Sequence, residues 1–486
     1  MKPRRSNPLL RSVFIAALAA ASCWSAAATA APGDPLGPAF EITSVGARGR
    51  PTVARAPSGD FVVVYHDTQS LLGGVSARRF HADGTPNGAA IQVVAPSSTI
   101  AVLDEKSVGM DRLGNFVIAW TEWSAGVSNA KARRYAADGN PLAAPFVIDE
   151  TAMVNPGTFS PSVAVGPDGN FVIAWLRSYS SGVYAYDHFI PGCLSGIEYE
   201  IVDPSIRFRQ YRADGSAITA RGGTVVVSKP GLSLDAFACL IGVSLYVSSL
   251  GAYGGDTLAT PVIAMAADGS FSIAWSLQEG LGAVVNGVPA APTPTTINLQ
   301  RYSALGLPAA ARQVAQGIPG LFSGFEELLA PRIAQGAAGT ALVWNLLSYD
   351  RKNFANNLAL NTRTYGPAGL PRQLQPSAVA AGRQVWTWDD YTPDVAATPT
   401  GAVAVWRSSA RTGSVISQQI NAQRLDANGA LIGPVIAVAN SADTNLAVFA
   451  APSVASDASG NFAVFWSALN HDISDVRMYG RLYSGQ

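Results

Sequence analysis

Charge and cysteine are both scarce in this chain of 486 residues. Asp, Glu, Lys and Arg make up 14% of it, compared with roughly 25% in ordinary soluble domains, and the 33 basic and 33 acidic side chains leave no net charge. Without a basic excess to attract phosphate groups, nucleic acid is not an expected partner. The 3 cysteines include no C-x-x-C pair, which argues against a redox role.

The motifs of common enzyme classes are absent as well. The chain has no G-x-S-x-G elbow, no H-E-x-x-H zinc motif, no Walker loop and no G-x-G-x-x-G after a strand. Its Asp-Gly-Asn turns lack the alternating oxygen ligands of an EF-hand loop. The sequence therefore predicts no cofactor and no metal, and it argues against an enzyme without excluding one.

The first 30 residues predict a secretory signal peptide. A basic start is followed by an apolar stretch at 13–21 and by a small-residue A-x-A site at 28–30. The apolar stretch is shorter than the ~20 residues of a membrane-spanning helix, so no transmembrane segment is expected in the mature chain. Cleavage after Ala30 predicts a secreted or periplasmic protein. Cleavage before Cys23, which would make a lipoprotein, is the alternative.

A sequence motif that recurs seven times carries most of the structural information. Its fullest copy spans residues 161–175, and the segment 114–120 has the same sequence as 169–175. A repeat of this length indicates several like units that share one continuous core. Weaker copies end at Tyr65, Trp275, Trp344, Trp406 and Trp466.

Each copy is typical of two strands joined by a tight hairpin. In the fullest copy Phe171, Ile173 and Trp175 alternate with Val172 and Ala174, so the strand is apolar on both faces and is expected to be covered on both sides. The Asp-Gly-Asn before it tolerates the positive φ of the turn. A Pro-x-Val-Ala segment before the turn is expected to be the preceding strand.

Two further strands complete each unit. A third strand, of the type R-x-Y-x-A-D-G, recurs at 77–84, 132–139, 209–215 and 423–429, and a short fourth strand follows at 91–94, 146–148, 225–227 and 435–438. Seven repeats of four antiparallel strands predict an all-β fold, a seven-bladed β-propeller. The widest spacing, from Trp175 to Trp275, predicts an insertion, with an eighth blade as the alternative.

The two ends of the chain predict how the ring closes. The chain stops where a third strand turns, and residues 33–42 match the turn and fourth strand at 429–438. The N-terminal strand is therefore expected to complete the last blade, which leaves no open sheet edge. We expect one propeller domain over residues 31–486, with long insertions at about 176–205 and 231–260.

These repeats resemble those of bacterial secreted β-propeller proteins with D-G-x-F-V-V-A-W and R-x-Y-x-A-D-G repeats, akin to the delta-60 type. The resemblance covers roughly residues 33–486 and implies the fold. It implies no activity, because the Trp-Asp, Gly-Gly and Asp-box signatures of better-known propellers are absent.

The long loops are expected on one face of the propeller. The hairpin turns are short, and length variation falls in the other loops, at 176–205, 231–260, 278–296, 345–361 and 377–392. Binding usually resides in such loops on a rigid scaffold. Cys193 and Cys239 lie in the first two insertions, which predicts a disulfide between them, with free thiols as the alternative.

Polar and aromatic residues on this face are the binding candidates. Aromatic rings stack on sugar rings, and carboxylates accept hydrogen bonds from hydroxyls. Packing against adjacent blades and loop hydrogen bonding are the structural alternatives for the same residues. The candidates are His66, Asp67, Glu122, Trp123, Arg177, Trp386, Trp388, Asp389, Asp390, Arg407, His471 and Asp472.

The sequence predicts a secreted binding module, expected to be a monomer, that recognises a glycan or another extracellular protein on the long-loop face. One alternative is a polysaccharide hydrolase or lyase, with carboxylates such as Glu122 and Asp389 as acid and base. Another is an envelope structural lipoprotein. Fold alone does not decide among them.

Overall fold

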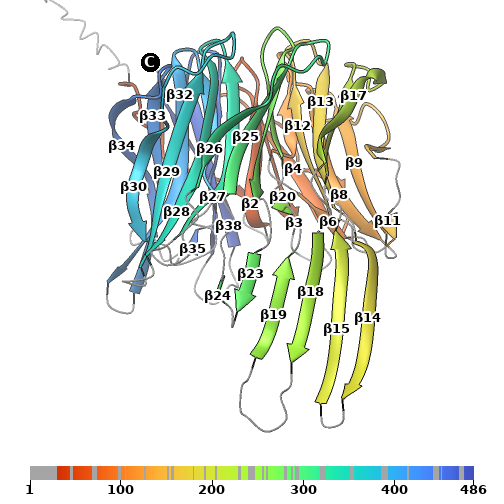
Figure 1. Ribbon diagram of the computed structural model, residues 1–486. Helices are drawn as coiled ribbons and strands as arrows, with labels where there is room; N and C mark the ends of the chain where they lie inside the picture. The colour runs from red at the N-terminus through yellow and green to blue at the C-terminus, as the bar shows by residue number, and fades with distance from the viewer. Residues whose placement is uncertain are drawn as a thin grey trace, which may run out of the picture.

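The computed structural model is a ring of seven four-stranded antiparallel blades, a β-propeller, as predicted from the repeats (Figure 1). No helix in the described part of the chain is long and apolar enough to cross a membrane. The structure describes residues 30–485 except 44–46, 68–73, 97–99, 104–105, 125–126, 150–152, 155–157, 179, 191–192, 203–204, 228–230, 239–246, 254–256, 259–260, 279–281, 286–287, 290–294, 318–324, 351–354, 385–391, 413–414, 442–447, 450 and 470–475.

The strands of each blade follow one another along the chain from the inner edge of the sheet to its outer edge. Blade 1 contains β2 (Ala47–Arg55), β3 (Phe61–Asp67), β4 (Gly74–Phe80) and β5 (Ile91–Val94). Blade 2 contains β6 (Ile100–Val102) and β7 (Val108–Met110) on the inside, then β8 (Phe116–Ser124), β9 (Val127–Tyr135), β10 (Phe146–Val147) and β11 (Met153–Val154). Blade 3 contains β12 (Thr158–Val165), β13 (Phe171–Ser178), β16 (Ser205–Tyr211) and β17 (Ala217–Val227).

The remaining blades repeat this order. Blade 4 contains β20 (Thr257–Leu258), β21 (Val262–Met265), β22 (Phe271–Gln278), β25 (Thr295–Tyr302) and β26 (Arg312–Gln316). Blade 5 contains β27 (Phe325–Gly336), β28 (Gly339–Asp350), β29 (Ala355–Tyr365) and β30 (Ser377–Gln384). Blade 6 contains β31 (Asp394–Thr398), β32 (Gly401–Thr412), β33 (Val415–Asp426) and β34 (Leu431–Asn440). Blade 7 contains β35 (Val448–Phe449), β36 (Ser453–Ser456), β37 (Phe462–Leu469), β38 (Val476–Tyr483) and, from the N-terminus, β1 (Phe40–Thr43).

The second strand of each blade is covered on both faces, as its apolar pattern predicts. In β13, Phe171, Ile173 and Trp175 pack with residues of blade 2, whereas Val172 and Ala174 pack with residues of blade 4. The turn before this strand contains a glycine at φ 84°, a conformation that favours residues without a Cβ. Each blade therefore shares its core with both neighbours.

The N-terminal strand closes the ring, which confirms the prediction from the chain ends. β1 pairs antiparallel with β38, with Phe40 opposite Gly480 and Glu41 opposite Tyr479. The backbone N–H of Gly33 donates to the carbonyl of Ser484 at 2.8 Å. Blade 7 is thus built from both ends of the chain, and its outer edge is completed by β1.

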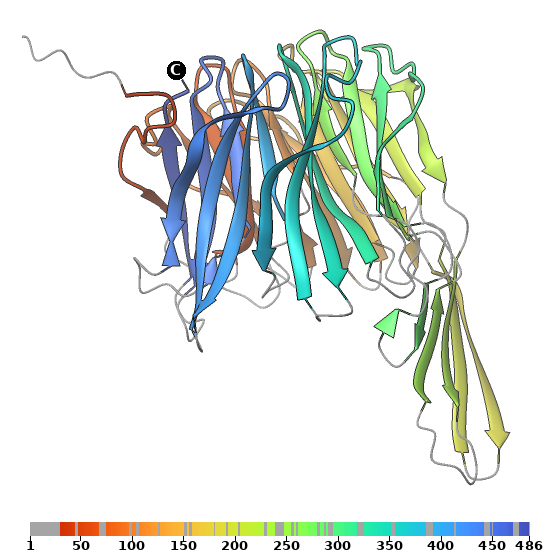
Figure 2. The same ribbon diagram turned by 60° about the vertical axis from the view of Figure 1, so that its left-hand side comes forward.

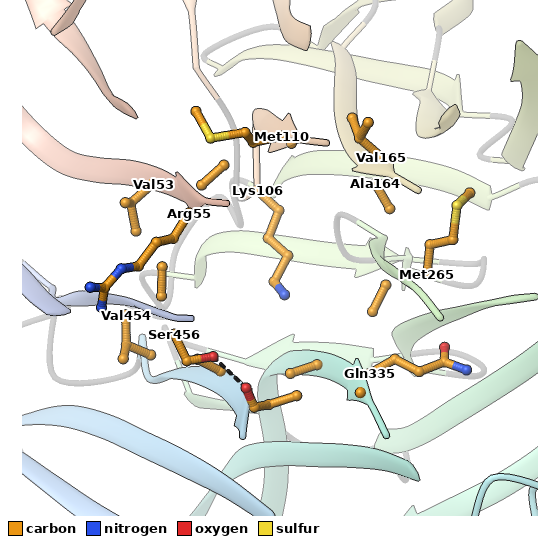
Figure 3. Close-up of a pocket in the computed structure, with 18 of the residues that line it drawn as sticks. Val53, Arg55, Lys106, Met110, Ala164, Val165, Met265, Gln335, Val454 and Ser456 are labelled. Carbon is orange, nitrogen blue, oxygen red and sulfur yellow. Dashed lines mark hydrogen bonds between the residues drawn. The ribbon is translucent and has the colours of Figure 1, made fainter. Parts of the chain in front are cut away.

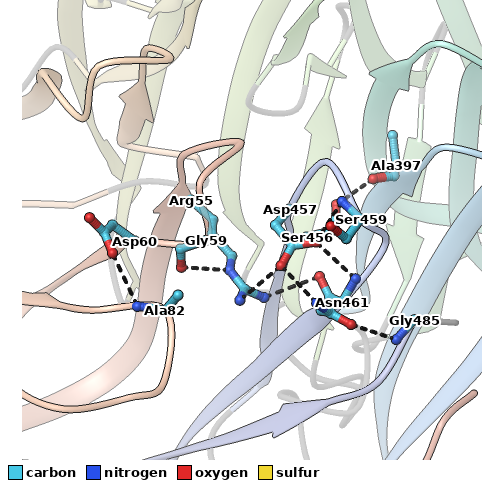
Figure 4. A network of polar contacts seen from close by, with 10 residues as sticks. All are labelled: Arg55, Gly59, Asp60, Ala82, Ala397, Ser456, Asp457, Ser459, Asn461 and Gly485. Atoms are coloured by element: carbon cyan, nitrogen blue, oxygen red, sulfur yellow. Dashed lines mark hydrogen bonds and ion pairs between the residues drawn. The ribbon is translucent and has the colours of Figure 1, made fainter. Parts of the chain in front are cut away.

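A buried ion pair reinforces this junction between blades 7 and 1 (Figure 4). The Arg55 guanidinium lies 3.2 Å from the Asp457 carboxylate, and the two side chains are only 2% and 7% exposed. The same guanidinium donates to the carbonyls of Gly59 at 2.8 Å and Asn461 at 3.1 Å. The Asn461 side chain in turn accepts a hydrogen bond from the Gly485 N–H at 2.9 Å. These contacts tie the hairpin turns of the first and last blades together.

A separate six-stranded sheet protrudes from one face of the ring (Figures 1 and 2). Four of its strands lie in the wide spacing between Trp175 and Trp275, and the other two follow Trp275. Three insertions build it: one after β13, one after β17 and one after β22. In order across the sheet, its strands are β14 (Ser180–Ile190), β15 (Cys193–Val202), β18 (Gly231–Ala238), β19 (Val247–Tyr253), β23 (Gly282–Val285) and β24 (Val288–Pro289).

Candidate functional site

A cavity of about 1040 Å³ runs along the axis of the propeller. The inner strands of all seven blades line it, and side chains such as Val53, Val165, Met265 and Val454 give much of its length an apolar wall (Figure 3). Small-ligand sites are commonly apolar cavities with a few placed polar groups. The residues that depart from this apolar lining therefore identify the candidate site.

One such departure lies at the first position of the Pro-x-Val-Ala segment, which each blade carries in its inner strand region. Six blades have proline there, and blade 2 has Lys106, at φ 51°. Proline is held near φ −65°, so the backbone of Lys106 takes a path that the repeat residue cannot follow. The six prolines are Pro51, Pro161, Pro261, Pro331, Pro393 and Pro452.

The Lys106 side chain extends into the middle of the cavity (Figure 3). Its ammonium donates a hydrogen bond to the carbonyl of Ile333 in blade 5, so the side chain crosses the axis from blade 2. Its own carbonyl accepts a hydrogen bond from the Val163 N–H of blade 3 at 3.0 Å. Lys106 therefore places its amino group on the propeller axis.

The next position of the same segment also differs in two blades from the residue type that the other blades share. It is Ser, Thr or Val in five blades, but Arg332 in blade 5 and Asp394 in blade 6. Both are buried, with 2% and 6% of their surface exposed. Arg332 donates to the carbonyl of Pro331 at 2.8 Å, and one Asp394 carboxylate oxygen accepts the Val454 N–H at 3.0 Å.

Arg50, which precedes this segment in blade 1, reaches across blade 7 to blade 6. Its guanidinium lies 3.4 Å from the Asp394 carboxylate and donates to the carbonyls of Pro393 and Pro452, both at 3.2 Å. We call Arg50, Lys106, Arg332 and Asp394 the axial cluster. It combines three basic side chains with a single carboxylate.

The electrostatics of the cluster are set by burial and by this excess of positive charge. Burial lowers the pKa of Lys106; Asp394 opposes that effect, whereas Arg332 and Arg50 add to it. A site shielded from water disfavours the protonated form of an amine. The axial cluster therefore holds a lysine of lowered pKa beside one carboxylate and two guanidinium groups.

His66 is the predicted site residue that lines the same cavity. Its Nε2 accepts a hydrogen bond from the Leu103 N–H at 3.2 Å, so the ring is neutral with its proton on Nδ1. Burial lowers its pKa, which keeps the imidazole neutral near pH 7. His66 can accept or donate a hydrogen bond but adds no charge to the cavity.

The structure does not bring the other described candidates to this cavity. The Glu122 carboxylate pairs with the Lys131 ammonium at 2.5 Å and accepts the Trp120 indole N–H at 3.3 Å, away from the cavity lining. Arg407 is buried in β32, with 1% of its surface exposed, and Arg177 is half-buried at the end of β13.

The remaining predictions concern residues whose side chains the structure does not describe. Asp67 and Trp123 lie in β3 and β8. Cys193 begins β15 and Cys239 lies outside the described residues, so the part of the chain that is described contains no disulfide. It also contains no group of three His, Cys, Asp or Glu side chains that could hold a metal. Trp386, Trp388, Asp389, Asp390, His471 and Asp472 lie outside the described residues.

Sequence reasoning missed the axial cluster, although a signal for it is present. The predicted candidates lie at the ends of the second strands and in the long loops. The informative positions are instead the exceptions within the Pro-x-Val-Ala segment, where Lys106, Arg332 and Asp394 replace the residues that most blades share. Aligning the seven copies column by column identifies all three.

Comparisons with known proteins add little to this picture. No protein-family model and no curated protein sequence matches the chain. Among solved structures it is similar to a protein of unknown function from Dyadobacter fermentans, at 10% identity over 80% of this chain and 98% of that one, with a TM-score of 0.40. It is also similar to a polysaccharide lyase, at 9% identity over 93% of this chain and 100% of that one, with a TM-score of 0.38. A third similar structure is a fucose-specific lectin from Aleuria aurantia, at 10% identity over 92% of this chain and 98% of that one, with a TM-score of 0.31. At these TM-scores the similarities carry no argument.

Proposed function

We propose that this protein is an exported binding module that holds a glycan on the face from which the three insertions emerge. The observation that carries the proposal is that the axial cavity, lined by all seven blades, holds the polar residues that depart from the repeat. The inner strand of a blade begins where its second strand ends, as the pairing of Thr158 with Ser178 in blade 3 illustrates. Asp394 begins β31, but Arg50 and Arg332 lie inside β2 and β27, and Lys106 lies between β6 and β7. The axial cluster therefore sits part-way along the inner strands, between the hairpin turns and the face that carries the protruding sheet.

The shape of the site favours a ligand that inserts a small polar group. A concave cavity with converging donors and acceptors suits a sugar unit better than the flat surface of a protein partner does. The axial cluster supplies ammonium and guanidinium donors and a carboxylate acceptor, and His66 adds an imidazole. Export, the glycan class and the resemblance to delta-60-type propellers remain predictions from the sequence.

The charged end of the cavity does not favour a glycosidase. That chemistry requires two carboxylates flanking the scissile bond. Of the described carboxylates that line the cavity, Asp394 is paired with Arg50, Asp457 is paired with Arg55, and Asp268 lies in the hairpin turn of blade 4, where it accepts the Ser270 N–H. A binding function therefore accounts for the described groups more simply than an acid and base pair does.

A glycan array, combined with product analysis of incubated polysaccharides, tests the proposal. We expect binding to a defined set of oligosaccharides without cleavage. Hydrogen-exchange mass spectrometry of the complex should then show protection at the starts of the inner strands and not at hairpin turns such as 111–115. Absence of binding to every glycan, or protection confined to the hairpin turns, would contradict it.

A further inference from the structure

We propose that the protruding sheet is a dimerisation surface, and that one of its two faces packs against the same face of a second copy of this chain. The inference does not depend on the glycan proposed above, and it differs from the monomer expected from the sequence. It rests on the isolation of the sheet, on the division of charge between its two faces and on the area of the face that has no charge.

The sheet stands apart from the ring. In both views it extends beyond one face of the propeller (Figures 1 and 2). Its strands contact one another, and no other described strand makes more than isolated contacts with them. A sheet with an apolar face needs a second layer against which to bury that face. The described part of the chain does not provide this layer.

The strand register assigns the residues of the sheet to its two faces, because residues that pair across adjacent strands share a face and successive residues alternate. One row of pairs runs through Tyr184, Tyr199, Leu234, Ala252 and Ala283. The next row on the same face runs through Tyr186, Ile197, Ala236, Leu250, Val285 and Val288. The other paired residues of this face are His188, Ile190, Cys193, Ser195, Ile201 and Leu232. None of these residues is Asp, Glu, Lys or Arg, so we call it the uncharged face.

The opposite face carries all the acidic residues of the sheet. Glu198 pairs with Asp235, and Asp187 and Glu200 lie on the same face. The six strands contain no Lys or Arg. Alternation of this kind is typical of a sheet that is buried on one face and solvated on the other. The uncharged face is therefore the one that requires a cover.

A second copy of the chain is the cover that this face fits best. Two uncharged faces related by a two-fold axis meet without bringing any charge into the contact, and charged residues are depleted at the core of protein interfaces. Two sheets packed face to face about 10 Å apart form a sandwich, which gives each sheet its missing layer. A lipid surface is less suited, because anionic headgroups attract basic residues and the sheet has only acidic ones.

The area of the uncharged face agrees with an interface between two proteins. With strands about 4.8 Å apart and about 3.4 Å between residues, its paired residues cover a plane of roughly 550 Å². The accessible surface of such a plane is larger, because side chains project from it. Stable interfaces bury about 800 Å² on each partner, so the sheet is large enough to hold two copies together.

Sedimentation velocity of the mature chain at about 1–100 µM tests the proposal, because interfaces of this size bind with micromolar or tighter affinity. We expect the wild type to form a dimer in this range. Leu234→Asp, in the middle of the uncharged face, should weaken dimerisation at least about tenfold, because it buries a charge without a partner. Circular dichroism and glycan binding should be unchanged, since the ring has its own core.

Val284 and Val285 provide a matched pair of variants, because they are adjacent in β23 and lie on opposite faces. Val285→Asp, on the uncharged face, should weaken dimerisation, whereas Val284→Asp should dimerise as the wild type does. Equal dimerisation of these two variants and the wild type would overturn the assignment of the interface to this face.

A wild type that stays monomeric at about 100 µM would overturn the proposal. If that monomer sediments with phosphatidylcholine vesicles and Leu234→Asp does not, the uncharged face binds lipid instead of a second copy. If the monomer binds no vesicles, the face is covered by a segment of its own chain outside the described residues. Each of these results leaves the glycan proposal standing, because a glycan array tests that proposal separately.

Discussion

The indole hydrogen bond of Trp175 allows the contribution of one buried hydrogen bond to the stability of a blade to be measured. The Trp175 Nε1–H donates to the buried Asp149 carboxylate at 2.9 Å, and the ring is 3% exposed. Trp344 holds the same position in blade 5 and is fully buried, but its Nε1–H is buried without a hydrogen-bond acceptor among the described residues. The two residues therefore form a matched pair that differs in one hydrogen bond to a charged group.

We expect Trp175→Phe to lower the free energy of unfolding by more than Trp344→Phe does. Both substitutions remove the same ring volume, but only the first removes a donor to a carboxylate, which contributes about 1.5–3 kcal/mol. Trp175→Ala and Trp344→Ala should each lower the free energy of unfolding by about 3–5 kcal/mol, because each leaves an empty space in the core. Equilibrium urea denaturation followed by circular dichroism measures these differences, provided that the m-values agree.

A double-mutant cycle isolates the hydrogen bond. In an Asp149→Asn background the cost of Trp175→Phe should approach the cost of Trp344→Phe, because the acceptor is no longer charged. Equal losses for Trp175→Phe and Trp344→Phe in the parent protein would refute the reasoning.

Three further predictions concern ionisable groups. The folded state lowers the pKa of Lys106 below 10.5, so protonated Lys106 destabilises the folded protein. The stability of the wild type relative to Lys106→Met should therefore rise as the pH increases towards 10.5. A difference in thermal stability between the two proteins that does not change with pH would contradict this. His66 also has a lowered pKa, so wild-type stability should fall as the pH drops below 6.5, and His66→Gln should flatten that decline in the same assay. Arg55→Met should lower the free energy of unfolding, measured by urea denaturation, by about 3–5 kcal/mol, because it leaves the buried Asp457 carboxylate without its cation. Adding Asp457→Asn to this variant should recover part of the loss. If it recovers none, the two groups are not coupled.

The fold could be predicted from the sequence because its determinants are local and repeated. Phe171 to Trp175 alternate between two neighbouring cores, and that requirement is visible as an unbroken apolar run in each copy. Ring closure was predictable because residues 33–42 repeat the pattern of 429–438, so the N-terminal strand carries the register of a fourth strand.

The protruding sheet was predicted only as an insertion. Its strands come from three loops that lie far apart in the sequence, and β15 pairs with β18 across the whole of β16 and β17. No repeat marks those strands, and non-local pairing of single strands leaves no periodic signal that joins one loop to another.

The candidate site was predicted poorly for a similar reason. Arg50, Lys106, Arg332 and Asp394 are brought together only by the register of the blades around the axis, since each lies in a different blade. Arg407 was predicted as a binding candidate from its place beside an anchoring tryptophan, and its side chain is buried in β32, which the sequence pattern alone does not reveal.

A crystal structure of the protein with a bound oligosaccharide would test the central claim most directly, namely that the ligand is held by the residues that depart from the repeat. We predict ligand density in the axial cavity, with a ligand hydroxyl about 2.5–3.0 Å from the Asp394 oxygen that accepts no hydrogen bond among the described residues. Density on the hairpin face, or on the outer strands with an empty axial cavity, would contradict the account.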